Sequence, residues 1–135
     1  SSKFLQVEGE AVSLDDIEHR ILRPIWKDPR IHYAVNCASV SCPNLSRIAY
    51  TASNFEELAD AGARAYVNSP RGARFDNDGL HVSSIYTWFK ADFGGSDAGI
   101  IAHLRQFAAP VLAARLGSMK RVASDSYDWS LNDRE

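Results

Sequence analysis

The sequence contains two cysteines, Cys37 and Cys42, which lie five positions apart. They follow the run from Ile31 to Cys37, which is rich in β-branched and aromatic residues and predicts a buried strand. A loop at the end of a strand often carries reactive side chains, because a rigid element fixes their position while the loop stays accessible. We therefore expect one cysteine, and favour Cys37, to be a thiolate nucleophile of the kind used in acyl transfer.

A cysteine nucleophile needs a base, and the chain offers His19, His32, His81 and His103. If residues 31–37 are extended, His32 and Cys37 lie roughly 16 Å apart and project from opposite faces of the strand. His32 is then a half-buried structural histidine, or one that reaches the second cysteine if the loop folds back. His103 follows an amphipathic helical pattern and is expected at the surface or at its boundary.

A rival scheme uses the chain order Cys37, His81 and Asp92. This is the order of cysteine, histidine and acid or amide in papain-like enzymes. Asp92 also fits an ordinary acid at the end of a helix, because Gly94 and Gly95 follow it closely.

Two further states of the cysteines are open. A disulfide between Cys37 and Cys42 would close a small loop and remove on the order of 2 kcal/mol of unfolded-state entropy. Such a bond is either a structural staple or the resting, oxidised form of a reactive thiol. A zinc site would use both cysteines and two histidines as ligands. The sequence has no second closely spaced ligand pair to complete it. We expect no metal and no cofactor.

Composition places the chain in one domain, residues 1–135. It has 135 residues, 45% of them hydrophobic, and 15 basic against 17 acidic side chains give a net charge of −2. Such a balance does not favour nucleic-acid binding, which requires clustered Lys and Arg. A membrane span is not expected either, because the longest nearly apolar stretch, residues 107–114, is far short of the roughly 20 residues required.

Local patterns predict an α+β domain in which a small antiparallel or mixed sheet is surrounded by about four helices. The expected elements are hairpins in 3–13 and 75–82, helices in 14–23, 53–68, 84–93, 96–108 and 110–116, and the strand 31–37. The aromatic tail 127–132 is expected to dock on the body. Five aromatic side chains, one of them in this tail, are assigned to the core rather than to a ligand groove: Tyr86, Trp88, Phe89, Phe93 and Trp129.

Several strings of the sequence, in order and spacing, resemble the bacterial branch of the domain of unknown function 547 family. They are Asp16-Ile17-Glu18-His19 with Ile21 to Pro24, Arg30 to Ser39, Ser41-Cys42-Pro43, Ser84 to Phe89 with Asp92-Phe93, and Tyr127 to Asn132. The resemblance covers nearly the whole chain from Leu14 to Asn132. It implies a fold compared with papain-like thiol hydrolases, which by itself does not establish catalysis.

The resemblance also implies site residues. Within its motifs, His19 is the preferred partner of Cys37, with Glu18 beside it. The secondary candidates within the motifs are Cys42, His32, Asn36, Ser39 and Asp92, and His81, which lies outside them, is a candidate through the rival chain order alone.

One motif of the family has no counterpart here, namely an additional N-terminal helical portion with an Asn-x-Tyr-Asn signature. The chain is therefore expected to lack that portion, to expose an apolar surface and to associate with the missing piece or with itself. Export of bacterial relatives favours the periplasm or cell envelope over the cytoplasm.

The leading function is thiol-dependent hydrolysis or acyl transfer at an amide or isopeptide bond of a small peptide-like substrate. Cys37 would attack the carbonyl, His19 would take its proton, and backbone amides of residues 38–41 would hold the oxyanion. The alternative is a non-catalytic module that binds a protein partner and is stapled by a Cys37–Cys42 disulfide.

Overall fold

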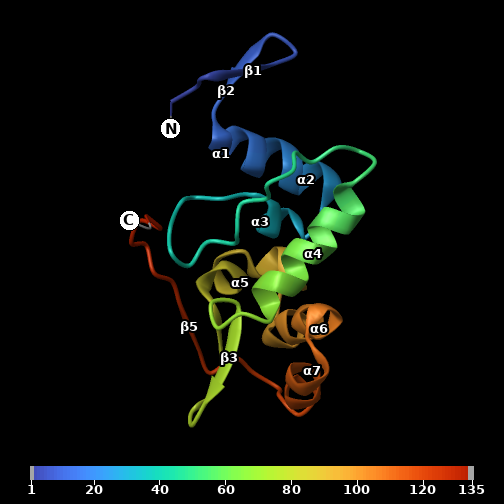
Figure 1. The fold of residues 1–135 in the computed structure, drawn as a ribbon, viewed down its shortest axis with the longest axis vertical. Coiled ribbons are helices and arrows are strands. Elements are labelled where there is room, and N and C mark those ends of the chain that lie inside the picture. Colours follow the sequence, from blue (N-terminus) through green and yellow to red (C-terminus); the bar gives the residue numbers. More distant parts are fainter. Residues whose placement is uncertain (1, 134–135) are drawn as a thin grey trace.

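The fold is taken from a computed structural model, which describes residues 2–133. Within these residues, two small sheets and about six helices form an α+β structure (Figure 1), so the predicted fold class is confirmed. The expected single sheet is divided in two, and the helices are more numerous than the four or so expected. None of the helices in the described residues has the length and apolar character needed to cross a bilayer.

The elements follow one another with short connections, except for the loop between residues 35 and 54. The first half contains β1 (Leu5–Val7), β2 (Glu10–Val12), α1 (Leu14–Asp16), η1 (Ile17–Leu22), α2 (Arg23–Trp26), α3 (Ile31–Ala34) and α4 (Phe55–Val67). The second half contains β3 (Ala73–Asp76), β4 (Gly79–Ser83), α5 (Ser84–Trp88), η2 (Lys90–Phe93), α6 (Asp97–Phe107), α7 (Pro110–Leu116) and β5 (Ser124–Ser126).

The N-terminal hairpin confirms the first predicted strand pair. β1 and β2 are antiparallel, and the hairpin projects from the body of the molecule (Figure 1). Its side chains are mostly exposed, and Phe4 just before it is 87% exposed. Leu14, Ile25 and Trp26 are also exposed large hydrophobic residues of this N-terminal part. Association through this part of the chain stays a prediction.

The first helix does not end before Pro24 as its sequence predicts. A capping box of Ser13 and Asp16 starts α1 where the predicted helix begins, but the chain then continues through η1, a π-helical stretch, into α2. In the wider turn the N–H of Arg23 donates to the carbonyl of Glu18, five residues back. A π-helical turn changes the hydrogen-bond register, so the chain accommodates a proline that cannot donate.

The predicted strand over residues 31–37 is wrong. Ile31 to Ala34 form the helical turn α3, and the chain becomes extended only at Val35. The turn starts from Asp28-Pro29, because Asp28 accepts the N–H of Arg30 at 2.9 Å and the carbonyls of residues 28–30 accept the next three N–H groups. Pro29 precedes the N-cap Arg30, and its fixed φ suits the turn that leads into α3, so this local signal outweighs the strand propensity of the run.

The core lies between α3, α4, α5, α6 and the central strand β4. Its largest fully buried side chains are Tyr33, Tyr66, Tyr86, Phe93, Leu80, Ile100, Leu104 and Leu116. His103 belongs to this core and is 7% exposed, which corrects its expected place at the surface. The Tyr33 hydroxyl lies 2.6 Å from His103 Nε2. Burial lowers the pKa of His103 to about 4, so the ring is neutral at pH 7.

The second sheet has the order β3-β4-β5 and is mixed. β3 and β4 form the predicted antiparallel hairpin, whereas β5 pairs with β4 in parallel. After β5 the chain runs back along the body toward the loop that follows α3 (Figure 1), and Leu131 forms a bridge with Ser39. The aromatic tail therefore docks as predicted.

Candidate functional site

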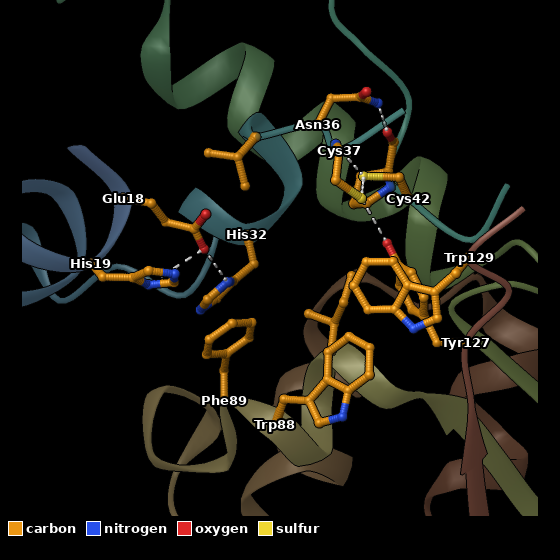
Figure 2. A pocket seen from close by; sticks show the side chains of 13 residues that line it. Glu18, His19, His32, Asn36, Cys37, Cys42, Trp88, Phe89, Tyr127 and Trp129 are labelled. Carbon is orange, nitrogen blue, oxygen red and sulfur yellow. Dashed lines mark hydrogen bonds and ion pairs between the residues drawn. The ribbon is translucent and has the colours of Figure 1, made fainter. Parts of the chain in front are cut away.

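A pocket of about 190 Å³ lies where η1, the chain after α3, α5 and the C-terminal tail meet (Figure 2). Its apolar lining consists of Val35, Pro43, Ile85, Trp88, Phe89, Tyr127 and Trp129. The polar and sulfur-containing lining consists of Glu18, His19, His32, Asn36, Cys37 and Cys42. The three residues of the expected catalytic set, Cys37, His19 and Glu18, thus share one pocket with three of the secondary candidates.

Cys37 carries an exposed thiol held by hydrogen bonds. Its Sγ lies 3.1 Å from the hydroxyl of Ser39, 3.1 Å from that of Tyr127 and 2.9 Å from the Cys42 sulfur. Burial alone would raise the pKa of Cys37, but hydrogen bonds from Cys42, Ser39 and Tyr127 to the thiolate outweigh it and hold the pKa at about 7. Near neutral pH a large share of Cys37 is therefore the nucleophilic thiolate.

Cys42 is the opposite kind of thiol. Its side chain is buried, at 5% exposure, and its sulfur accepts the backbone N–H of Cys37 at 2.9 Å. Burial and the neighbouring Cys37 raise its pKa above the ordinary value. The structure has both cysteines free, so it describes the pair without the predicted disulfide.

The loop between the cysteines is fixed by the C-terminal tail. The N–H groups of Val40 and Ser41 donate to the carbonyls of Ser130 and Asp128, at 2.9 and 3.2 Å. Ala38, which has a positive φ of 60°, donates its N–H to Asn36 Oδ1 at 2.8 Å. The N–H groups of Ala38, Val40 and Ser41 thus already have acceptors within the protein. These three groups therefore do not form the oxyanion cradle that was expected from residues 38–41.

Asn36 and Ser39 support the loop rather than face a histidine. Asn36 Nδ2 donates to the carbonyl of Pro43 at 2.7 Å, in addition to the bond from Ala38. Ser39 is buried and its hydroxyl oxygen lies 2.9 Å from that of Tyr127. Both residues therefore position the sulfur of Cys37.

His32 lies on α3 and is 2% exposed. Its Nε2 lies 2.8 Å from Asp92 Oδ2, which also accepts from Arg23 Nε at 2.6 Å. Its ring stacks on Phe89 with centroids 4.4 Å apart. Burial lowers the pKa of His32 although Asp92 opposes the shift, so the ring is neutral at pH 7. A neutral ring that donates from Nε2 to the carboxylate has an acceptor lone pair on Nδ1.

The position of His32 corrects the geometric argument made from an extended strand. Because residues 31–34 are helical, the estimated separation along a strand does not apply, and His32 and Cys37 line the same pocket. In Figure 2, His32 and His19 lie beside Glu18 at one end of the pocket. The two sulfurs and Tyr127 lie at the other end. The hydrogen bonds of Cys37 Sγ in the described residues go to groups other than histidine.

His19 is more exposed than His32, with 40% of its side chain open to solvent. Its Nδ1 lies 3.1 Å from Arg23 Nη1, which can only donate. Glu18 Oε1 lies 3.9 Å from this nitrogen and 3.8 Å from Nδ1 of His32. Glu18 thus faces two imidazoles and supplies negative charge between them.

The rival order Cys37, His81, Asp92 is not assembled. His81 lies on β4 and is absent from the lining of the pocket, with Nε2 at 2.6 Å from Asp76 and Nδ1 against Ser124. Asp92 contacts His32 instead. Asp76, Asp78 and His81 lie together at the end of the β3–β4 hairpin. Within residues 2–133, these three side chains form the group whose possible metal-ligand atoms all lie within 4.8 Å of one another.

Tyr127 and three tryptophan or phenylalanine side chains were missed as pocket residues. Trp88, Phe89 and Trp129 line the pocket, whereas Tyr86 and Phe93 are in the core as predicted. Tyr127 lies 90 positions from the cysteine that it contacts. The aromatic character of the tail predicted its docking, but nothing local indicated which loop it would reach.

We expect the alkylation rate of Cys37 by iodoacetamide to rise with pH around a midpoint near 7, below the ordinary thiol value of 9.0. The thiolate is the reactive form, so the rate falls as pH drops through the folded pKa. Mass spectrometry of quenched samples measures the rate at this cysteine. Tyr127→Phe removes one donor to the thiolate and should move the midpoint upward, and urea-unfolded protein should return it to the ordinary range. A midpoint near 9 for the folded wild type would contradict the site as described.

Comparisons with known proteins were made against family models, curated proteins and solved structures. Residues 1–67 match the family described as "Protein of unknown function, DUF547". Neither the curated proteins nor the solved structures gave a match. The matched residues include η1 and α3 with the cysteine loop and exclude α5 and the tail, which form the other wall of the pocket. On this match, the N-terminal part of the chain is similar to the DUF547 family, whose function is unknown.

Proposed function

We propose that the protein is a thiol-dependent acyl transferase or hydrolase in which Cys37 attacks the carbonyl carbon of its substrate. The proposal rests on one observation above all: an exposed sulfur, with a pKa of about 7, lines a pocket that also contains a buried histidine held by a carboxylate. A thiolate is already present near neutral pH, so its formation needs no direct contact with an imidazole.

In the first step, the thiolate of Cys37 adds to the carbonyl and expels the leaving group, which leaves an acyl thioester on the sulfur. An amide substrate requires a proton on its leaving nitrogen. The hydroxyl of Tyr127, which hydrogen-bonds to the sulfur, can supply it although burial raises the pKa of this hydroxyl, and the tyrosinate then takes a proton back from solvent. An activated ester whose leaving group is a stable anion does not require this proton.

In the second step, water attacks the thioester carbonyl, the C–S bond breaks, and the Cys37 thiolate leaves as the carboxylic acid is released. We assign the role of base to His32, because Asp92 holds Nε2 and the lone pair of Nδ1 is directed to the side of Glu18. A neutral imidazole accepts the proton of water, and Glu18 stabilises the positive charge that forms on the ring. His19 is the second candidate, since it lies on the other side of Glu18 but receives a hydrogen bond from Arg23.

The lining of the pocket favours an uncharged apolar acyl group. Trp88, Phe89, Tyr127 and Trp129 provide large aromatic surfaces, and Val35 and Ile85 provide aliphatic ones. A small peptide-like substrate with an apolar side chain beside its scissile carbonyl meets these requirements. The relation to papain-like hydrolases, to the bacterial branch of the family and to the cell envelope belongs to the same proposal and is supported by the motif resemblance alone.

A burst experiment tests the proposal. Fully reduced protein is mixed with p-nitrophenyl butanoate, whose acyl chain is short and apolar. We expect a rapid release of nitrophenolate close to one equivalent of protein, followed by slower turnover. Mass spectrometry after acid quenching should place the butanoyl group on Cys37. A non-catalytic binding module would instead give no burst beyond that of urea-unfolded protein, and acylation confined to lysines would also contradict the proposal.

A further inference from the structure

We propose that Cys37 and Cys42 have a second activity, which is thiol–disulfide exchange with a small disulfide of the glutathione type. In this reaction the pair closes into an intramolecular disulfide and reduces the small molecule. The proposal uses a sulfur of the proposed acyl-transfer site, but it rests on the geometry of the two sulfurs and their different exposure.

The two sulfurs differ in access. Cys37 is exposed at the pocket, whereas Cys42 is buried beneath the loop at 5% exposure. A disulfide that arrives from solvent therefore meets Cys37 first. Cys42 is protected from such an attack and remains a thiol until a bond forms next to it. This division is the one that exchange requires, with one attacking and one resolving sulfur.

The hydrogen bonds around the pair favour the same order. Ser39 and Tyr127 stabilise a negative charge on Cys37, which makes this sulfur the attacking one. The backbone N–H of Cys37 donates to the Cys42 sulfur at 2.9 Å and would stabilise the thiolate that Cys42 becomes in the second step.

Closure needs little movement. The sulfurs are 2.9 Å apart, compared with about 2.05 Å for a disulfide bond. The N–H of Cys42 donates to the carbonyl of Ser39 at 3.0 Å, so the loop already turns back on itself. The tail holds the loop at Val40 and Ser41, and this keeps the two sulfurs together.

The exchange proceeds in two steps. The thiolate of Cys37 attacks one sulfur of glutathione disulfide, forms a mixed disulfide and releases one glutathione thiolate. Cys42 then loses its proton to that thiolate or to solvent and attacks the Cys37 sulfur, which releases the second glutathione. Two electrons pass from the cysteine pair to the glutathione disulfide. The product has no thiolate at residue 37, so the exchange would also switch off acyl transfer, a consequence that rests on the proposed function.

The experiment follows the thiols directly. Reduced wild type, Cys42→Ser and Cys37→Ser are incubated with glutathione disulfide, quenched with acid at intervals, alkylated and weighed by mass spectrometry. The wild type should pass through a glutathione adduct to a form with no adduct and no alkylatable thiol, and dithiothreitol should restore both thiols. Cys42→Ser should stop at the adduct on Cys37. Cys37→Ser should form an adduct at least about tenfold more slowly, because Cys42 is buried and its pKa is raised.

Two results would overturn the proposal: a wild type that keeps the glutathione adduct without closing, or a Cys37→Ser variant that reacts as fast as Cys42→Ser. Circular dichroism checks that the variants are folded, and Cys42→Ala replaces Cys42→Ser if the latter is not. The burst assay on the same samples separates the two hypotheses. A burst lost on closure and regained with dithiothreitol supports the switch, whereas reduced wild type that closes but never gives a burst refutes acyl transfer and leaves the exchange established.

Discussion

Cys37→Ala is expected to abolish the nitrophenolate burst and the acylated species in mass spectrometry, and to lower turnover of p-nitrophenyl butanoate by on the order of 10³-fold or more. The variant removes the only exposed thiol of a chain that has two cysteines. Without the sulfur the pocket still binds an acyl group, but no covalent intermediate forms. Stopped-flow absorbance measures the burst, and intact-protein mass spectrometry measures the acyl adduct.

Cys42→Ser is the matched control for this prediction. It removes the other cysteine and one neighbour of the Cys37 sulfur, yet leaves the attacking group in place. We expect this variant to retain a burst, with its pH midpoint displaced upward because the serine hydroxyl is shorter and holds the thiolate less closely. If Cys42→Ser lost the burst while Cys37→Ala kept it, the assignment of the nucleophile would be reversed.

His32→Gln is expected to keep the burst and to slow the subsequent hydrolysis by about 10²–10⁴-fold, the usual contribution of a general base. Glutamine preserves a polar group next to Asp92 but cannot take a proton from water. The butanoyl thioester on Cys37 should therefore accumulate, and mass spectrometry during the steady state should detect it. In the wild type, hydrolysis should weaken as pH falls through the lowered pKa of His32, because protonation removes its lone pair.

His19→Gln is the control for His32. His19 lies at the same pocket and faces the same carboxylate, but it is more exposed and its Nδ1 is occupied by Arg23. We expect its hydrolysis rate to stay within a few-fold of wild type. Accumulation of the thioester in His19→Gln, and not in His32→Gln, would move the base to His19, as the family resemblance implies.

The parts of the fold that could be predicted from sequence are those specified locally. The two hairpins have turn residues between alternating strands, and Ser13 caps its helix with its own neighbours. Helices α4 and α6 each carry apolar residues at helical spacing along one face, and this face is the buried one. The helix predicted over residues 53–68 begins slightly later than expected, because α4 begins at Phe55 after Asn54.

The errors arose where a local preference competed with the chain around it. In residues 31–37 the residue types favour a strand, but the preceding Asp28-Pro29 starts a helical turn instead. Pro24 predicts the end of a helix, but the chain continues through it because the preceding stretch is π-helical, a register that the residue types alone do not indicate. The first error bears on the site, since the strand prediction placed His32 on the wrong kind of element.

The site was predictable in its composition but not in its contacts. The cysteine loop, Glu18, His19 and His32 all belong to motifs of the sequence, and all line one pocket. The pairing of His32 with Asp92 and of Cys37 with Tyr127 depends on segments 60 and 90 positions away. Such contacts follow from the packing of whole elements, which no spacing within a short motif determines.

The docking of the C-terminal tail has a consequence for the order in which the site becomes complete during synthesis. The cysteine loop leaves the ribosome long before Tyr127, which supplies one of the hydrogen bonds to the Cys37 sulfur. The N–H groups of Val40 and Ser41 also have no acceptor until residues 128 and 130, whose carbonyls accept them, have been synthesised. A nascent chain therefore carries an ordinary, largely protonated thiol, and the reactive thiolate arises only when residues 127–130 have been synthesised and have docked.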